Sequence, residues 1–157
     1  MHPSSTAIRT ILEGAGLHSE VRSLAASTHT AAEAAATLDC EVGAIASSLV
    51  FLADAEPILV LASGAHRVDT TVLAGQIGAQ AVTRASADEV RLATGQPIGG
   101  VSPVGHPRPL RTYIDVELKE HGELWAAAGT PNAVFEIAYD QLKELTDATE
   151  VVVDGAV

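Results

Sequence analysis

The sequence predicts a mixed α+β domain. Two apolar runs, 45–52 and 58–62, flank the short polar segment 53–57, and this arrangement is typical of a β-hairpin. Elsewhere, segments with helical spacing of apolar residues are interleaved with further short β-type runs. Because a hairpin interrupts the alternation of strand and helix, a doubly wound parallel sheet is not expected. The 157 residues suit one domain with a single core.

Capping residues and apolar spacing predict the helices. Ser4 or Ser5 can begin a first helix that ends near Gly14, and Thr30 with Glu33 three residues later forms a capping-box pair. Ser86 and Glu89 form a second such pair. The expected helices after the first are 31–38, 68–77 closed by Gly78, 86–94 closed by Gly95, and 139–146.

Short apolar or alternating runs predict the remaining strands. They lie at 21–24, 80–84, 112–118, 124–128 and 133–137. The domain is expected to span 1–157, with an ordered core at about 6–147 and a weakly ordered tail after Asp147.

The formal net charge of −11 argues against a sequence-independent grip on nucleic acid, which depends on lysine and arginine at phosphates. Arg108 and Arg111 are the nearest approach to a basic patch. Any contact with RNA should therefore have a small footprint, such as the end of the molecule, and no binding to DNA is expected. The chain has no apolar run long enough to span a membrane and no leader pattern, and its one cysteine, Cys40, fits a reducing compartment. A cytoplasmic protein is expected.

Residues 98–110 form a loop rich in glycine and proline between segments of regular structure. Glycines allow close approach of another backbone or a ligand, and prolines fix the chain direction. Apolar residues such as Val101 and Val104 would anchor this loop to the core, unlike a flexible linker. The pattern fits equally a tight crossover between strands and a binding loop that presents backbone groups.

No spacing of histidines or cysteines predicts a metal site, and no phosphate-binding or dinucleotide-binding loop is present, so no cofactor is expected. What remains are two glycine turns, 99–105 and 129–131, and the hydroxyls of Thr28, Ser47 and Ser102. Together they could form a small pocket of backbone amides that stabilises an oxyanion. The alternative is that each hydroxyl only caps a helix or bonds to nearby backbone.

Seven short motifs follow one another along the chain: EVGAI at 41–45, SLVF at 48–51, SG at 63–64, RVD at 67–69, TG at 94–95, IGGVSPVGH at 98–106 and WAAAGTP at 125–131. Their order resembles the YbaK/EbsC-type editing domain family, which is associated with prolyl-tRNA synthetase, over residues 6–147. It implies a mixed, curled β-sheet, a partial barrel flanked by helices. It also implies a free-standing aminoacyl-tRNA deacylase that needs no cofactor and hydrolyses the ester of mischarged tRNA.

In that family the G-x-x-x-P element, here Gly99 to Pro103, holds the terminal adenosine and the aminoacyl group. The resemblance implies catalytic roles for Ser47, Gly99 and Gly100. The substrate-binding residues that it implies are Thr28, Val101, Ser102, Pro103, His106, Gly129, Thr130 and Pro131. The expected partners are the acceptor end of a mischarged tRNA and an aminoacyl-tRNA synthetase.

The sequence departs from the family at Ser47, because members commonly carry a lysine directly before the Ser-Leu-Val-Phe strand. Loss of such a donor typically costs about 10²–10³-fold in rate. Ser47 could donate a neutral hydrogen bond, or Arg108, Arg111 or His106 could approach from elsewhere. Two interpretations follow: a deacylase that works without the lysine, or a module that binds a small ligand, a tRNA end or a synthetase without hydrolysis.

Overall fold

The computed structural model describes residues 2–17, 20–25 and 30–154. Within these ranges the helices are α1 (Pro3–Gly14), α2 (Ala31–Leu38), α3 (Thr70–Ile77), α4 (Ala87–Thr94) and α5 (Tyr139–Thr146), with short 3₁₀ helices η1 (Val42–Ala44) and η2 (Val116–Glu120). The strands are β1 (Val21–Ser23), β2 (Ile45–Ala53), β3 (Glu56–Ser63), β4 (Val82–Arg84), β5 (Arg111–Asp115), β6 (Glu123–Ala127), β7 (Ala133–Ala138) and β8 (Thr149–Val151). No helix in the described ranges is long and apolar enough to cross a membrane.

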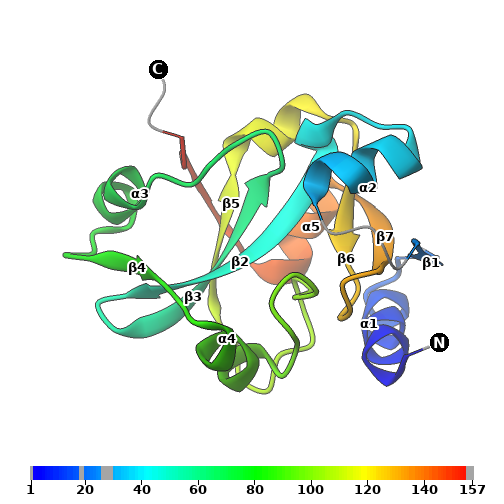
Figure 1. The fold of residues 1–157 in the computed structure, drawn as a ribbon, viewed down its shortest axis with the longest axis horizontal. Coiled ribbons are helices and arrows are strands. Elements are labelled where there is room, and N and C mark those ends of the chain that lie inside the picture. The colour runs from blue at the N-terminus through cyan, green and yellow to red at the C-terminus, as the bar shows by residue number, and fades with distance from the viewer. Residues whose placement is uncertain (1, 18–19, 26–29, 155–157) are drawn as a thin grey trace.

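The strands form one mixed sheet in the order β1-β7-β6-β2-β3-β5-β8, and β4 pairs separately with β2 (Figure 1). The β2–β3 hairpin is antiparallel, whereas β2–β6, β3–β5 and β5–β8 are parallel pairs. The sheet does not close, because β1 and β8 lie at its two ends. This arrangement confirms the predicted α+β class with a mixed sheet flanked by helices.

Strand β2 is paired discontinuously on the side away from β3. Parallel pairing with β6 covers Ile45 and Ala46, and antiparallel pairing with β4 covers 51–53. Within the described residues, positions 47–50 therefore have no strand partner on this edge. Figure 1 shows β4 and β6 toward the two ends of β2, with α4 and the loop that follows it below the stretch between them.

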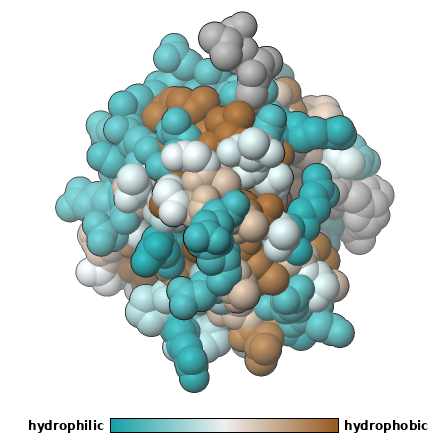
Figure 2. All heavy atoms as spheres, turned by 90° about the vertical axis from the view of Figure 1, so that its left-hand side faces the viewer, coloured by the Kyte–Doolittle hydropathy of each residue, from teal (hydrophilic) through white to brown (hydrophobic). Residues whose placement is uncertain are grey.

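The core lies on both faces of the sheet. Leu59, Leu61 and Ile114 face the larger cluster, which α1 and α5 cover with buried residues such as Leu12 and Leu142. A second cluster around Val60 packs under α3, and a third joins α2 to Trp125. Seen from the side of α3 and β4, the surface is mixed, with apolar atoms broken up by hydrophilic side chains (Figure 2).

The helix ends follow local capping chemistry. Helix α2 begins where Thr30 accepts a hydrogen bond from the Glu33 amide, and α4 begins at the complete capping box of Ser86 and Glu89, as predicted. The cap of α1 is His2 and not Ser4 or Ser5. Helix α3 begins at Thr70, two residues later than predicted, because the Asp69 carboxylate accepts from the Thr71 and Val72 amides.

Two expectations about strands are wrong. The predicted strand 112–118 ends at Asp115, whose carboxylate accepts from the Glu117 amide and begins η2. The tail after Asp147 is not weakly ordered through residue 154, because 149–151 form β8 against β5 and Val153 is buried. Glu150 fixes this strand by accepting from the Tyr139 hydroxyl at 2.5 Å and pairing with Lys119 at 2.6 Å. The Lys119 ammonium is the main cause that lowers the pKa of the Glu150 carboxyl.

Candidate functional site

A cavity of about 510 Å³ lies at the unpaired stretch of β2. Its walls come from β2, α2, α4, β6, β7 and the end of β4, and from the turn between β6 and β7, the connection between β3 and α3, and the loop that precedes β5. The side chains are mainly apolar, and include Val50, Val90 and Trp125. A few polar groups interrupt this lining. Such a mixture of apolar walls and few polar groups is typical of ligand-binding pockets.

The exposed edge of β2 supplies polar groups to this cavity. The Gly64 amide donates to the Ile45 carbonyl at 2.8 Å, so Ile45 bonds toward the β3 side. Because this direction alternates along an antiparallel strand, the N–H and C=O groups of Ser48 and Val50 point toward the unpaired edge. The buried Ser48 hydroxyl also lacks a hydrogen-bond partner among the described residues. The cavity therefore offers donors and acceptors that a ligand can satisfy.

Internal hydrogen bonds shape the loop between α4 and β5. The Gly100 amide donates to the Pro97 carbonyl at 2.9 Å and Gly99 has φ +86°, as in a turn that requires glycine at its third position. The Ser102 amide donates to Gln96 Oε1 at 2.7 Å. In contrast, the N–H groups of Gly99 and Val101 donate to no acceptor within the described part of the chain. Both residues line the cavity, so their amides are available to a ligand.

The two glycine turns meet at Gly100. A Cβ atom added there would lie 2.6 Å from the Thr130 carbonyl carbon and 2.7 Å from the Pro131 nitrogen. Only glycine permits this approach of two backbones. The second turn is held in place by α1, because the Ser5 hydroxyl donates to the Ala128 carbonyl at 2.8 Å and Gly129 packs against Ser4.

The structure brings together part of the predicted site. The predicted residues that line the cavity are Ser47, Gly99, Val101 and Pro131, with Gly100 and Thr130 in the backbone contact beside them. Those that do not line it are Ser102, Pro103, His106 and Gly129. Thr28 lies outside the described residues.

Ser102 and His106 stabilise the loop from within. The Ser102 hydroxyl bonds to the Val104 carbonyl and accepts from the Val104 amide at 3.0 Å. His106 Nε2 lies 2.8 Å from the Ser102 carbonyl oxygen, so this nitrogen carries the hydrogen. These contacts set the shape of the G-x-x-x-P backbone without placing either side chain in the cavity.

The cationic residues of the cavity are Arg67 and Arg84, with His66 beside them. Arg108 and Arg111, which the sequence suggests as substitutes for the lysine, are not among its lining residues. His66 Nδ1 lies 2.8 Å from the buried Asp115 carboxylate, and its Nε2 lies 3.7 Å from Asp154. Sequence reasoning missed Arg84 because only the pairing of β4 with β2 brings it to this site.

The partly buried environment of His106 predicts a pH dependence of stability. Desolvation lowers the pKa of His106 from its ordinary value of 6.5, although its bond to the Ser102 carbonyl opposes this shift. Between the lowered pKa and 6.5 the unfolded chain binds more protons, so the free energy of unfolding rises with pH in that window and levels off above it. We expect His106→Gln, which keeps an N–H donor, to lose less stability than the parent when the pH falls from about 7.5 to about 5. Urea titrations at several pH values measure this difference, and equal acid slopes would contradict it.

Comparisons with known proteins identify similar chains and a matching family. The family described as "Aminoacyl-tRNA editing domain" matches residues 25–145. The protein YwhH of Bacillus subtilis is 30% identical over 91% of both chains. Proline--tRNA ligase of Nitratidesulfovibrio vulgaris (strain Hildenborough) is 33% identical over 58% of this chain, which corresponds to 16% of the ligase. A solved structure described as that of a candidate trans-editing enzyme for prolyl tRNA synthetase superposes with a TM-score of 0.93, at 40% identity and 99% coverage of both chains.

Proposed function

The chain belongs to the aminoacyl-tRNA editing domain family, and from this premise we propose that it is a free-standing deacylase that hydrolyses the ester of mischarged tRNA. The observation that carries the proposal is the cavity lined by Gly99 and Val101, whose amides have no acceptor among the described residues. Hydrolysis would occur in the cytoplasm, where tRNA is charged and used. The family assignment and the retained cavity favour the enzyme over a module that only binds.

In this proposal the aminoacyl ester lies against the G-x-x-x-P backbone. Water adds to the ester carbonyl carbon, and the negative charge that develops on the carbonyl oxygen is stabilised by the amides of Gly99 and Val101. The bond between the carbonyl carbon and the ribose oxygen then breaks, and the ribose oxygen takes up the proton that the attacking water gives up. The products are the free amino acid and a tRNA with a free ribose hydroxyl. A neighbouring ribose hydroxyl orients the attacking water, so the chain contributes positioning and electrostatic stabilisation.

The shape of the site limits what can react. The edge of β2, with the backbone of Ser48 and Val50, contacts the bound end of the substrate, and Pro131 of the second glycine turn also bounds the cavity. The terminal nucleoside and the aminoacyl group share a cavity of about 510 Å³, so its size limits which amino acids fit. Selection by size in a second site is the principle of double-sieve editing. The partners are the tRNA acceptor end and the synthetase that produces the mischarged tRNA.

Single-turnover hydrolysis of a panel of aminoacyl-tRNAs tests this function. One tRNA body charged with alanine, serine, threonine or proline isolates the effect of the amino acid. We expect rapid release of at least one small amino acid. The variant Arg91→Gln, which changes an exposed residue of α4 outside the cavity, serves as a control that should match the parent. Tight binding of the tRNA end with no release of any amino acid would instead identify the binding module, which the serine at position 47 favours.

A further inference from the structure

We propose that Arg67 and Arg84 form an anion-binding subsite at the cavity, and that it binds a phosphodiester group of the tRNA acceptor strand. The ligand assignment rests on the proposed function, whereas the subsite can be tested by binding alone. Arg84 of β4 and Arg67 of the connection between β3 and α3 supply the positive charge that a serine at position 47 does not provide.

The charge of the lining residues is the first argument. The chain contains 20 acidic and 9 basic residues, yet no aspartate or glutamate is found among the described residues that line the cavity. The side chains there that carry a permanent charge are Arg67 and Arg84. Carboxylates that contact lining residues are Asp115 and Asp154 beside His66, and Glu33, which accepts from the Thr30 hydroxyl at 3.1 Å. A locally cationic cavity favours an anionic ligand, while the net negative charge of the rest of the protein disfavours binding of a polyanion elsewhere.

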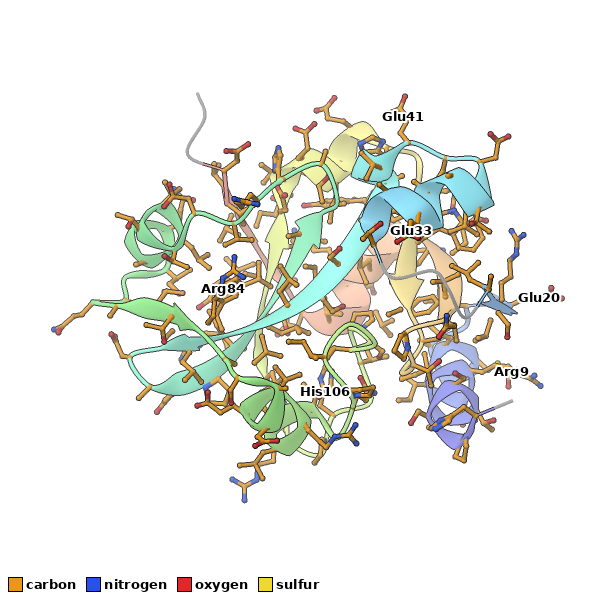
Figure 3. The ribbon with its side chains drawn as sticks, in the orientation of Figure 1. Arg9, Glu20, Glu33, Glu41, Arg84 and His106 are labelled. Atoms are coloured by element: carbon orange, nitrogen blue, oxygen red, sulfur yellow. The ribbon has the colours of Figure 1, made fainter. Side chains whose placement is uncertain are left out.

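Strand register places Arg84 on the face of β2 that carries Ser47. Arg84 lies directly opposite Phe51 in the β2–β4 pair, so their side chains share a face. Side chains alternate along β2, and therefore Ser47 and Phe51 also share that face. Figure 3 shows the labelled Arg84 side chain over the middle of the molecule, between β4 and the connection from β3 to α3.

Arg67 comes from the connection between β3 and α3. It follows the turn in which the His66 amide donates to the Ser63 carbonyl at 2.9 Å, and Ser63 pairs with Ala46, the neighbour of Ser47. Within the described ranges neither Arg67 nor Arg84 forms an ion pair, unlike Arg9 with Glu13 and Lys119 with Glu150. Their guanidinium groups are therefore free to bind a ligand.

The chemistry of arginine and of the substrate identifies the ligand class. A guanidinium group presents a planar set of donors that matches two phosphate oxygens. In an aminoacyl-tRNA the nearest phosphodiester is one nucleoside away from the ester. A substrate with its ester at Gly99 therefore carries its first phosphate toward the outer part of the cavity, where Arg67 and Arg84 are exposed.

The test measures binding of an uncharged RNA oligonucleotide that ends in CCA, by fluorescence anisotropy over a range of salt concentrations. The double variant Arg67→Gln/Arg84→Gln should bind about tenfold more weakly than the parent. The slope of log K against log salt should become shallower by about 0.7 for each phosphate that the variant no longer binds. Arg91→Gln removes one positive charge from α4 outside the cavity and should bind like the parent.

The same oligonucleotide with neutral methylphosphonate linkages distinguishes phosphate contacts from contacts to bases and sugars. The double variant should bind this neutral oligonucleotide as well as the parent does. The subsite is overturned if the double variant binds the charged RNA like the parent, or loses equal affinity for both oligonucleotides. The assignment to the acceptor strand is overturned if inorganic phosphate competes as effectively as the RNA.

Binding and hydrolysis can fail separately. If the double variant loses RNA affinity while the parent hydrolyses no ester, the subsite stands and the deacylase function fails. If the parent hydrolyses an ester and the double variant binds and hydrolyses like the parent, the function stands and the subsite fails. Thermal unfolding of each variant confirms that the compared proteins are folded.

Discussion

Gly100→Val is expected to abolish hydrolysis, with a loss of at least about 10²-fold in the single-turnover rate. A Cβ atom at position 100 would lie 2.6 Å from the Thr130 carbonyl carbon and 2.7 Å from the Pro131 nitrogen. Both are backbone atoms, which cannot move aside as the end of a flexible side chain can. The two glycine turns would have to separate, and this would displace the amides of Gly99 and Val101 from the ester.

Gly122→Val is the matched control for this substitution. Gly122 is exposed, lacks a positive φ and has no atom within 4 Å of its added Cβ position. It lies between η2 and β6, outside the cavity. We expect this variant to hydrolyse like the parent. Gly100→Ala tests the same contact with the smallest possible side chain, in case the valine variant does not fold. A folded Gly100→Ala protein with the full parental rate would show that the contact between the turns does not position the site.

Local sequence signals predicted much of the fold because they depend on neighbouring residues. The Ser86 and Glu89 capping box and the hairpin are confirmed, since each is encoded within a few positions. The strand at 149–151 was missed because its stability comes from β5 and from the contacts of Glu150, which are distant in sequence. A short run beyond the last helix carries no comparable local signal.

The candidate site shows the same limit. The glycine pattern marked the two turns, and the structure shows why Gly100 must be glycine at their contact. The cationic residues of the cavity could not be identified in this way, because Arg84 reaches it only through the register of β4 against β2. The unpaired edge of β2 likewise depends on where β4 and β6 end. Neither feature is expressed in the spacing of residues along the chain.

Ser47→Lys is expected to change hydrolysis in a way that depends on the two arginines. In the parent, a lysine at position 47 would place a third cation in a cavity that already contains Arg67 and Arg84. Because the proposed subsite already supplies the charge, we expect a change within about threefold. In the Arg67→Gln/Arg84→Gln variant, the same lysine would be the only lysine or arginine among the described residues that line the cavity. We expect it to raise the rate of that variant by about tenfold or more. Single-turnover hydrolysis of the four proteins completes a double-mutant cycle.

Ser47→Met separates charge from size in this cycle, because methionine lengthens the side chain without adding a cation. It should not restore hydrolysis in the double-arginine variant. If Ser47→Lys alone raised the rate by about 10²–10³-fold, the arginines could not be replacing the lysine. A gain of that size is what supplying a missing oxyanion donor produces. A coupling between position 47 and the arginines would instead mean that the site has kept its positive charge and moved it from β2 to β4 and the β3–α3 connection. The absence of the lysine would then be compatible with an active enzyme.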